Sequence, residues 1–381
     1  MKKLSLFAVG VVLTNLVSHV HAQVTLSPLA SFGGGDGWLS PGEGGYAYLT
    51  TGNTERGLAY GNGHVYLVSR ATVAGVSINI RILNPLTGAD MGGLDNSGIS
   101  GGTFPVNTIA VGGDGVIYVN NLTTQSTTSP LKVYRWATEG AAPTTVYSGD
   151  GALAGSRVGD SFAAIGSGSS TRLALGYNST PAVAGNNGYS IIDPTAGSAL
   201  AVAFAGTPPN AGDFRLGITF SDSSHVLGTQ GSSLYRYTSF LGTSGTLLGS
   251  PGIPDPAGAT ADRLLSYAVV NGLPLLAVQS IGDSHVSLYD LSNPGAPVYL
   301  ASGNNTVSPA ANANGTGQLA WGAITDNGDG TSSALLYAMS TNQGIQAFTV
   351  LVPEPSTMAL AALGGLFCAF RVIRRDRRNA F

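Results

Sequence analysis

The chain is almost free of cysteine. Its single cysteine, Cys368, lies close to the C-terminus. The rest of the chain therefore holds no disulfide and no thiol for nucleophilic chemistry. Zinc sites built from several cysteines are excluded for the same reason. Stability must come from a hydrophobic core, which a chain of 381 residues is long enough to bury.

Charge is also scarce. Only 10% of the residues are Asp, Glu, Lys or Arg, well below the quarter that is usual for globular proteins. Residues 23–352 contain ten basic and 18 acidic residues, a formal net charge of −8. This balance argues against nucleic acid or an anionic membrane surface as a partner of that region. Abundant small polar residues favour strands and turns, and the plentiful aliphatic residues argue against disorder.

Helical periodicity is missing between the two termini, where no segment keeps a 3.6-residue hydrophobic period over ten residues. A different unit recurs instead: an apolar strand, a turn of Gly, Asn, Asp or Ser, and a second apolar strand. One apolar residue in the first strand of each unit serves as its marker, and successive markers are 51, 53, 56, 49 and 53 residues apart. The markers are Leu58, Ile109, Phe162, Ile218, Tyr267 and Ala320.

Further strands complete each unit. A third strand follows the hairpin, as at 132–136, and a shorter fourth strand often follows the third, as at 298–300. Four antiparallel strands repeated about every 52 residues predict an all-β fold, a β-propeller built from four-stranded blades. The long insertion around 180–187 leaves five or seven blades as alternatives to six. A β-sandwich or a two-domain β protein is the other alternative, but the regular period argues against it.

The two ends of the repeat region complement each other. The sixth unit stops after its third strand, 345–350, whereas a spare strand lies at 24–32. We therefore expect about six blades, with the N-terminal strand completing the last one so that no strand edge stays unpaired. Pro28 is tolerable there, because an outermost strand has one edge free of ladder hydrogen bonds.

The N-terminus has the pattern of a secretory signal peptide. Lys2 and Lys3 precede the apolar stretch 4–13, and small residues at the −3 and −1 positions, Val20 and Ala22, indicate cleavage by signal peptidase after Ala22. A buried N-terminal helix is the alternative. The pattern predicts that the remainder of the protein is exported.

The C-terminus combines a rigid spacer, an apolar run and a basic end. Residues 357–373, as a helix, would span about 25 Å, which just reaches across a bilayer core of about 30 Å. We expect a single transmembrane helix with its arginines on the cytoplasmic side. Hydropathy alone leaves open whether this tail is a permanent anchor or a removable signal. The residues of the spacer and the basic end are Pro353, Glu354, Pro355, Arg371, Arg374, Arg375, Arg377 and Arg378.

This three-part order resembles the tail of bacterial PEP-CTERM proteins, which a membrane enzyme called exosortase processes. The resemblance implies passage through the cytoplasmic membrane and delivery to the cell surface or extracellular matrix. Three regions follow: a signal peptide at 1–22, a domain at 23–352 that resembles an uncharacterised β-propeller-like domain, and a sorting tail at 353–381.

Two loop motifs have formal matches to functional patterns. Residues 326–330, Asp-Asn-Gly-Asp-Gly, contain acids as calcium loops do, but Gly328 occupies an alternate ligand position and strands flank the segment, which favours a hairpin turn. Residues 98–102, Gly-Ile-Ser-Gly-Gly, match a nucleophile elbow. That motif needs a strand before it and a helix after it, and this segment is a Gly/Ser loop.

The histidines give no firm site either. His64 and His225 both begin the second strand of a hairpin, which would allow a shared metal site but more commonly reflects hairpin closure; His285 is the third histidine of the domain. Four Asn-X-Ser/Thr patterns begin at 121, 178, 304 and 314, and in a chain rich in Asn and Thr we interpret them as fortuitous.

We therefore predict no catalytic, cofactor-binding or metal-binding residues. The expected function is a non-enzymatic binding or structural role outside the cell, in association with exopolysaccharide or the envelope. The alternative is a polysaccharide hydrolase or lyase acting from the central channel of the propeller. Acids and aromatic residues facing that channel would favour the enzyme, whereas an apolar or glycine-lined channel would favour the binding protein.

Overall fold

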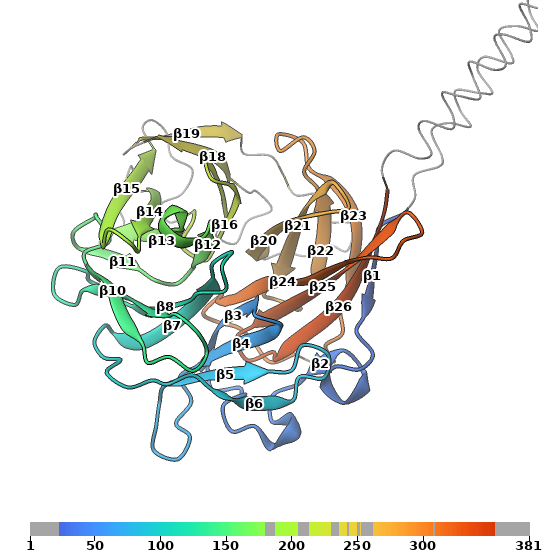
Figure 1. The fold of residues 1–381 in the computed structure, drawn as a ribbon, viewed down its shortest axis with the longest axis horizontal. Coiled ribbons are helices and arrows are strands. Elements are labelled where there is room, and N and C mark those ends of the chain that lie inside the picture. The colour runs from blue at the N-terminus through green and yellow to red at the C-terminus, as the bar shows by residue number, and fades with distance from the viewer. Residues whose placement is uncertain are drawn as a thin grey trace, which may run out of the picture.

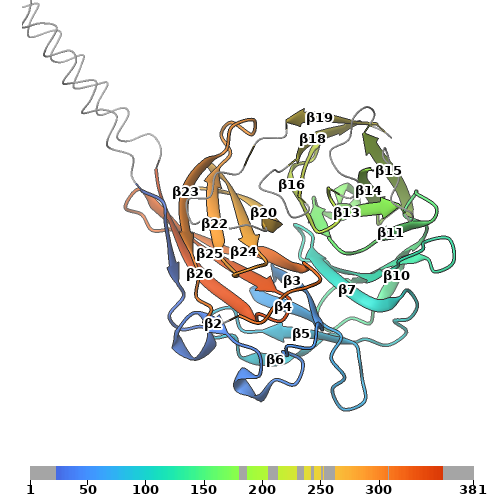
Figure 2. The ribbon, with the colours of Figure 1, turned by 180° about the vertical axis from the view of Figure 1, so that it is seen from behind.

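The fold was analysed in a computed structural model, which describes residues 23–179, 187–204, 213–229, 236–241, 244–249, 252, 262–307 and 309–354. These residues form 26 strands and three short 3₁₀ turns. The strands are arranged as a ring around a central axis in Figure 1, and Figure 2 shows the same ring from behind. The 3₁₀ turns are η1 (Gly33–Gly35), η2 (Glu43–Gly45) and η3 (Gly168–Ser170).

Three blades are regular four-stranded antiparallel meanders whose first strand is the innermost. The first blade comprises β3 (Glu55–Gly61), β4 (His64–Ser69), β5 (Asn79–Leu83) and β6 (Asp90–Gly93). The second comprises β7 (Phe104–Val111), β8 (Ile117–Leu122), β9 (Leu131–Trp136) and β10 (Thr144–Gly149). The fifth comprises β20 (Asp262–Val270), β21 (Leu273–Ser280), β22 (Val286–Asp290) and β23 (Val298–Gly303).

The third and fourth blades share one nine-stranded sheet. Their outer strands pair in parallel, with Ala203 opposite Ser244 and Phe204 opposite Gly245. The repeat did not predict this connection, nor the extra strand β11. The third blade contains β11 (Ser156–Val158), β12 (Ala163–Ile165), β13 (Arg172–Ser179), β14 (Asn187–Asp193) and β15 (Ser198–Phe204). The fourth contains β16 (Gly217–Asp222), β17 (His225–Thr229), β18 (Arg236–Leu241) and β19 (Ser244–Gly249).

The sixth blade joins the two ends of the domain. It consists of β24 (Gly317–Asp326), β25 (Thr331–Ser340), β26 (Ile345–Pro353) and the N-terminal β1 (Thr25–Pro28). β1 runs antiparallel to β26, with Thr25 opposite Leu351 and Pro28 opposite Phe348. A second short strand, β2 (Trp38–Leu39), pairs with the beginning of β26. The predictions of six blades and of closure by the N-terminal strand are both confirmed.

The closing strand is shorter than expected. The sequence predicts a strand over 24–32, but the ladder ends at Pro28. The chain then turns, because the Phe32 amide donates a hydrogen bond of 2.9 Å to the Leu29 carbonyl. This turn places the Phe32 side chain in the core, where it is fully buried.

Hydrophobic clusters fill the spaces between neighbouring blades. One cluster packs Val68 and Ile80 of the first blade against Ile109 and Ile117 of the second. The N-terminal segment contributes to two clusters on either side of the sixth blade, because Val24 lies in the cluster shared with the fifth blade and Phe32 in the cluster shared with the first. The ring is therefore closed by side-chain packing as well as by the strand ladder.

The ends of the chain are only partly visible. In the part that the structure describes, no helix is long and apolar enough to cross a membrane. The expected signal peptide at 1–22 and the expected transmembrane helix at 357–373 lie outside the described residues, as does almost all of the insertion around 180–187.

Deleting residues 23–32 should destabilise the ring, because the deletion removes β1 and the buried Phe32 and exposes the edge of β26. We expect the free energy of unfolding to fall by at least about 3 kcal/mol, with self-association through the open edge. Urea unfolding monitored by tryptophan fluorescence, combined with light scattering, measures both effects.

Thr25→Ala is the control for this deletion. Thr25 is exposed and the substitution keeps the backbone of β1, so its effect should stay within about 0.5 kcal/mol. A truncated chain as stable and as monomeric as the intact one would show that β1 does not close the ring.

Candidate functional site

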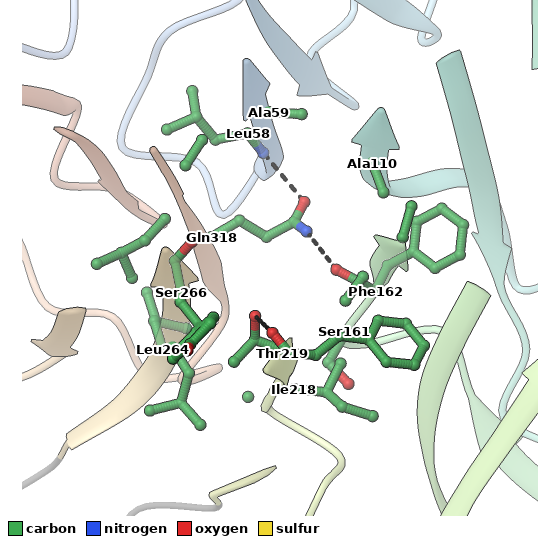
Figure 3. Close-up of a pocket in the computed structure, with 18 of the residues that line it drawn as sticks. Leu58, Ala59, Ala110, Ser161, Phe162, Ile218, Thr219, Leu264, Ser266 and Gln318 are labelled. Carbon is green, nitrogen blue, oxygen red and sulfur yellow. Dashed lines mark hydrogen bonds between the residues drawn. The ribbon is translucent and has the colours of Figure 1, made fainter. Parts of the chain in front are cut away.

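The inner strands of all six blades enclose a cavity of about 340 Å³ on the axis of the ring. Figure 3 shows part of its lining. Every marker of the sequence repeat, from Leu58 in the first blade to Ala320 in the sixth, lies in this lining. The period of the sequence thus located the inner strands and, with them, the central cavity.

Uncharged side chains line this cavity. Most are aliphatic or aromatic, and the polar ones are hydroxyls, such as those of Ser161, Thr219 and Ser266, together with the amide of Gln318. Among the described residues that form the lining there is no carboxylate, histidine or amine. A glycoside hydrolase needs a pair of carboxylates on either side of its substrate, and this lining does not supply one.

Gln318 crosses the axis and uses all four hydrogen bonds of its amide. From β24 of the sixth blade, its Oε1 accepts hydrogen bonds from the amides of Leu58, at 3.1 Å, and Ile109, at 3.0 Å. Its Nε2 donates to the carbonyls of Ile109 and Phe162, both at 3.0 Å. One side chain therefore links the sixth blade to the first three, as Figure 3 shows for two of the contacts.

Gly57 leaves the space that this crossing requires. A Cβ at that position would lie 2.9 Å from the Cα of Thr108 and 3.0 Å from Oε1 of Gln318. The first distance is shorter than Cβ contacts in proteins and the second is tight, so a larger residue would require the strand or the amide to shift.

A buried carboxylate lies at one mouth of the channel, where the inner strands begin. Asp160 is 1% exposed, and Arg157 binds both of its oxygens, with Nε to Oδ2 at 2.6 Å and Nη2 to Oδ1 at 2.9 Å. Arg215 approaches Oδ2 at 3.1 Å. Burial by itself would raise the pKa of Asp160, but the hydrogen bonds and charges of the two arginines outweigh it and hold that pKa below its ordinary value.

Further arginines lie near Asp160 and its two arginine partners. The Nη2 of Arg56 donates to the Asn53 carbonyl at 2.9 Å, and its Nη1 donates to the Thr316 hydroxyl. The guanidinium carbon of Arg70 lies 3.7 Å from the centroid of the Phe104 ring. Burial, followed by repulsion from Arg56, lowers the pKa of Arg70 to about 9. We call the group at this mouth the arginine cluster; its members are Arg56, Arg70, Arg157, Arg215 and Arg263.

The two histidines that began equivalent strands do not meet. His64 Nδ1 lies 2.6 Å from Glu139 Oε1 in one part of the ring, and His225 Nδ1 lies 2.7 Å from Asp222 Oδ2 in another. Across the described ranges, no group of three or more His, Cys, Asp or Glu residues has the spacing of a metal site. Each histidine instead forms a contact with one carboxylate.

The two loop motifs have the predicted structures. Residues 326–330 form the hairpin turn between β24 and β25, in which the Asp326 and Asp329 carboxylates accept backbone hydrogen bonds at 2.8 and 3.0 Å. Residues 98–102 form a loop between β6 and β7, without the strand and helix of a nucleophile elbow.

The sorting motif starts inside the sixth blade. Pro353 ends β26 opposite Thr331, and the Glu354 amide donates a hydrogen bond of 2.8 Å to the Gly330 carbonyl. Pro355, Ala22 and the C-terminal arginines lie outside the described residues.

Sequence analysis did not identify Gln318 or the arginine cluster. The repeat could have identified some of these residues. Arg56, Asp160 and Gln318 each lie two residues before the marker of their unit. Superimposing the six units would have placed these three polar residues at one level of the ring.

Two family models match parts of the chain. Residues 41–199 match a domain of unknown function, DUF4623, and residues 351–378 match the PEP-CTERM protein-sorting motif. The fold identifies the protein as an all-β propeller. The match to the tail indicates, in addition, that the protein is exported. The chain carries a PEP-CTERM sorting motif, which implies processing by exosortase, and a β-propeller of which residues 41–199 match the DUF4623 domain of unknown function.

Solved structures resemble the fold. A DUF4623 family protein from Bacteroides eggerthii has a TM-score of 0.59 at 18% identity, over 81% of this chain and 72% of that one. The allergen Mala s 1 of Malassezia sympodialis has a TM-score of 0.48 at 9% identity, over 79% of this chain and 92% of the allergen. At these identities the likeness to the Bacteroides protein shows the fold alone. Comparison with curated proteins gives no match.

Replacing Gln318 with leucine should destabilise the ring, because four backbone groups of three blades lose their partner. We expect a loss of about 3 kcal/mol in the free energy of unfolding. Thr219→Val is the matched control in the same cavity, since within the described part of the chain the Thr219 hydroxyl makes a single long hydrogen bond, of 3.4 Å, to the Phe220 carbonyl. Equal urea midpoints for the two variants would contradict a structural role for Gln318.

Proposed function

We propose that this protein is a non-catalytic binding or structural component of the cell surface or extracellular matrix, associated with exopolysaccharide or the envelope. The sorting motif supports delivery outside the cell. The observation that carries the non-catalytic role is the central cavity, whose described lining residues offer no acid or base. A hydrolase or lyase acting from the channel would need such groups there.

The composition of the lining suits a neutral or weakly polar ligand. Half-buried aromatic side chains, those of Tyr60, Tyr267 and Trp321, stand among serine and threonine hydroxyls. Apolar faces combined with a few hydroxyl groups are the usual makeup of small-molecule sites. Rings of this kind offer a flat apolar surface to the faces of sugar rings, while hydroxyls exchange hydrogen bonds with them.

The domain organisation is part of the proposal. Signal peptidase would cut after Ala22, residues 23–352 would form the mature propeller, and exosortase would process the tail that begins at Pro353. The position of Pro353 at the end of β26 supports this division, since the last ladder pair and the start of the tail coincide.

Intact mass spectrometry of fractionated cells and medium tests the processing. We expect a surface or soluble form that lacks residues 1–22 and ends near the 353–355 segment. Replacing the five C-terminal arginines with glutamine should reduce the yield of that form, because the basic end fixes the orientation of the tail. A full-length C-terminus confined to membranes would identify the tail as a permanent anchor.

Binding to the polymer is tested with the processed protein purified from the medium. In gels cast with exopolysaccharide from the producing cells, we expect slower migration than in plain gels, without any rise in reducing ends or unsaturated sugar products. Serum albumin in the same gels is the control. Product release would favour the enzyme, and unchanged migration without product would contradict the proposed function.

A further inference from the structure

Positive charge is concentrated at one place on this acidic domain. Residues 23–352 contain only ten basic residues, and five of them form the arginine cluster. Sparse surface charge would ordinarily be dispersed to keep a protein soluble. The convergence of half of the basic residues on one mouth of the channel therefore calls for a physical reason.

The cluster extends around the mouth. The Arg56 guanidinium binds the Thr316 hydroxyl, and the neighbouring Gly315 is so close to Arg263 that a Cβ there would lie 1.9 Å from Nη1. Arg215, whose charge is one cause of the lowered pKa of Arg263, binds Asp160. Contacts thus lead from the first blade through the sixth to the fifth, and a separate ion pair joins the fourth blade to the third.

Its charge is not balanced by the carboxylates around it. Asp160 is shared by two arginines, and one oxygen of Glu55 accepts hydrogen bonds from the Thr50 amide and the Thr54 hydroxyl. Even if the buried Asp213 is included, the described carboxylates number three against five guanidinium groups. Mutual repulsion within the cluster is one cause of the lowered pKa of Arg70 and of Arg263.

Two members lack a hydrogen-bond or ion-pair partner among the described residues, although the Arg70 guanidinium lies over the Phe104 ring. In the part of the chain that the structure describes, the guanidinium groups of Arg70 and Arg263 make no hydrogen bond or ion pair with another residue, and Arg70 Nη1 and Arg263 Nε are buried without an acceptor. Both side chains are half-buried, so other atoms of each group face solvent. Unpaired guanidinium groups of this kind favour a carboxylate, which they bind through two parallel hydrogen bonds.

We propose that the arginine cluster is a binding site for the carboxylates of an acidic extracellular polysaccharide, with Arg70 and Arg263 as the groups that contact the ligand. The proposal rests on the proposed function for its polymer, and it adds the chemical class of that polymer and the face that binds it. It differs from the central cavity, whose described lining contains none of these arginines.

The placement of the cluster suits this role. Thr316, which holds Arg56, also contacts Thr341, just before β26 begins, whereas the sorting tail leaves from the other end of that strand at Pro353. A strand of nine residues separates the two, roughly 26 Å at about 3.3 Å per residue. The arginine cluster therefore lies near the beginning of β26, at the opposite end of that strand from Pro353, where the tail begins.

Calorimetric titration of the processed protein with oligogalacturonate, and with its uncharged methyl ester, tests the inference. We expect the acid to bind at least about tenfold more tightly than the ester, and binding to weaken as salt rises from about 50 to about 500 mM. The double variant Arg70→Gln, Arg263→Gln should bind the acid at least about tenfold more weakly with an unchanged melting temperature. Arg172→Gln is the matched control, because Arg172 pairs with Asp193 in the third blade, outside the cluster.

The outcomes separate this inference from the proposed function. Equal binding of the acid and its ester, or unchanged binding by the double variant, would overturn the arginine site and leave polysaccharide binding intact. If no oligogalacturonate binds while the protein is still retarded by the native polymer, the acidic class is wrong and the proposed function stands. Failure to bind either oligogalacturonate or the native polymer would overturn both.

Discussion

The pairing of β1 with β26 is the interaction on which the ring depends. Elsewhere, successive blades are connected by the chain itself, so each one is held beside the next by a short covalent link. Only in the sixth blade do the two ends of the domain meet without such a link, through a four-residue ladder and the buried side chains of Val24 and Phe32. This noncovalent joint fixes the positions of all six inner strands, and so the geometry of the axis and of both its mouths.

The strand period and the turn residues predicted the number of blades and the closing strand, because each unit repeats the same local chemistry. They did not predict the role of Gln318, since its partners come from three other blades and the repeat contains no distances across the axis. The repeat did not predict the arginine cluster, for a related reason. Arg215 lies three residues and Arg263 four residues before its marker, so the members do not share one position in the unit.

The low charge of the domain helps to explain why the arginine cluster is incompletely paired. In a protein with many ion pairs, five guanidinium groups would find carboxylate partners on neighbouring strands. Here acidic residues outnumber basic ones, but few of them lie near the cluster, and others serve in turns, as Asp326 and Asp329 do. Asp160 pairs with Arg157 and Arg215, which leaves Arg70 and Arg263 without an ion-pair partner among the described residues. Because few carboxylates lie near the cluster, its unpaired arginines remain available to bind a ligand.

The joint in the sixth blade also sets the order in which the protein can be completed. The ribosome makes β1 first and β26 last, and the two are separated by nearly the whole domain. At about 5–20 residues per second, β1 waits roughly 15 to 60 seconds for its partner. Throughout that interval an apolar segment and an open strand edge must be kept from other chains. The N-terminal strand therefore stays without its ladder partner until the last blade has been made.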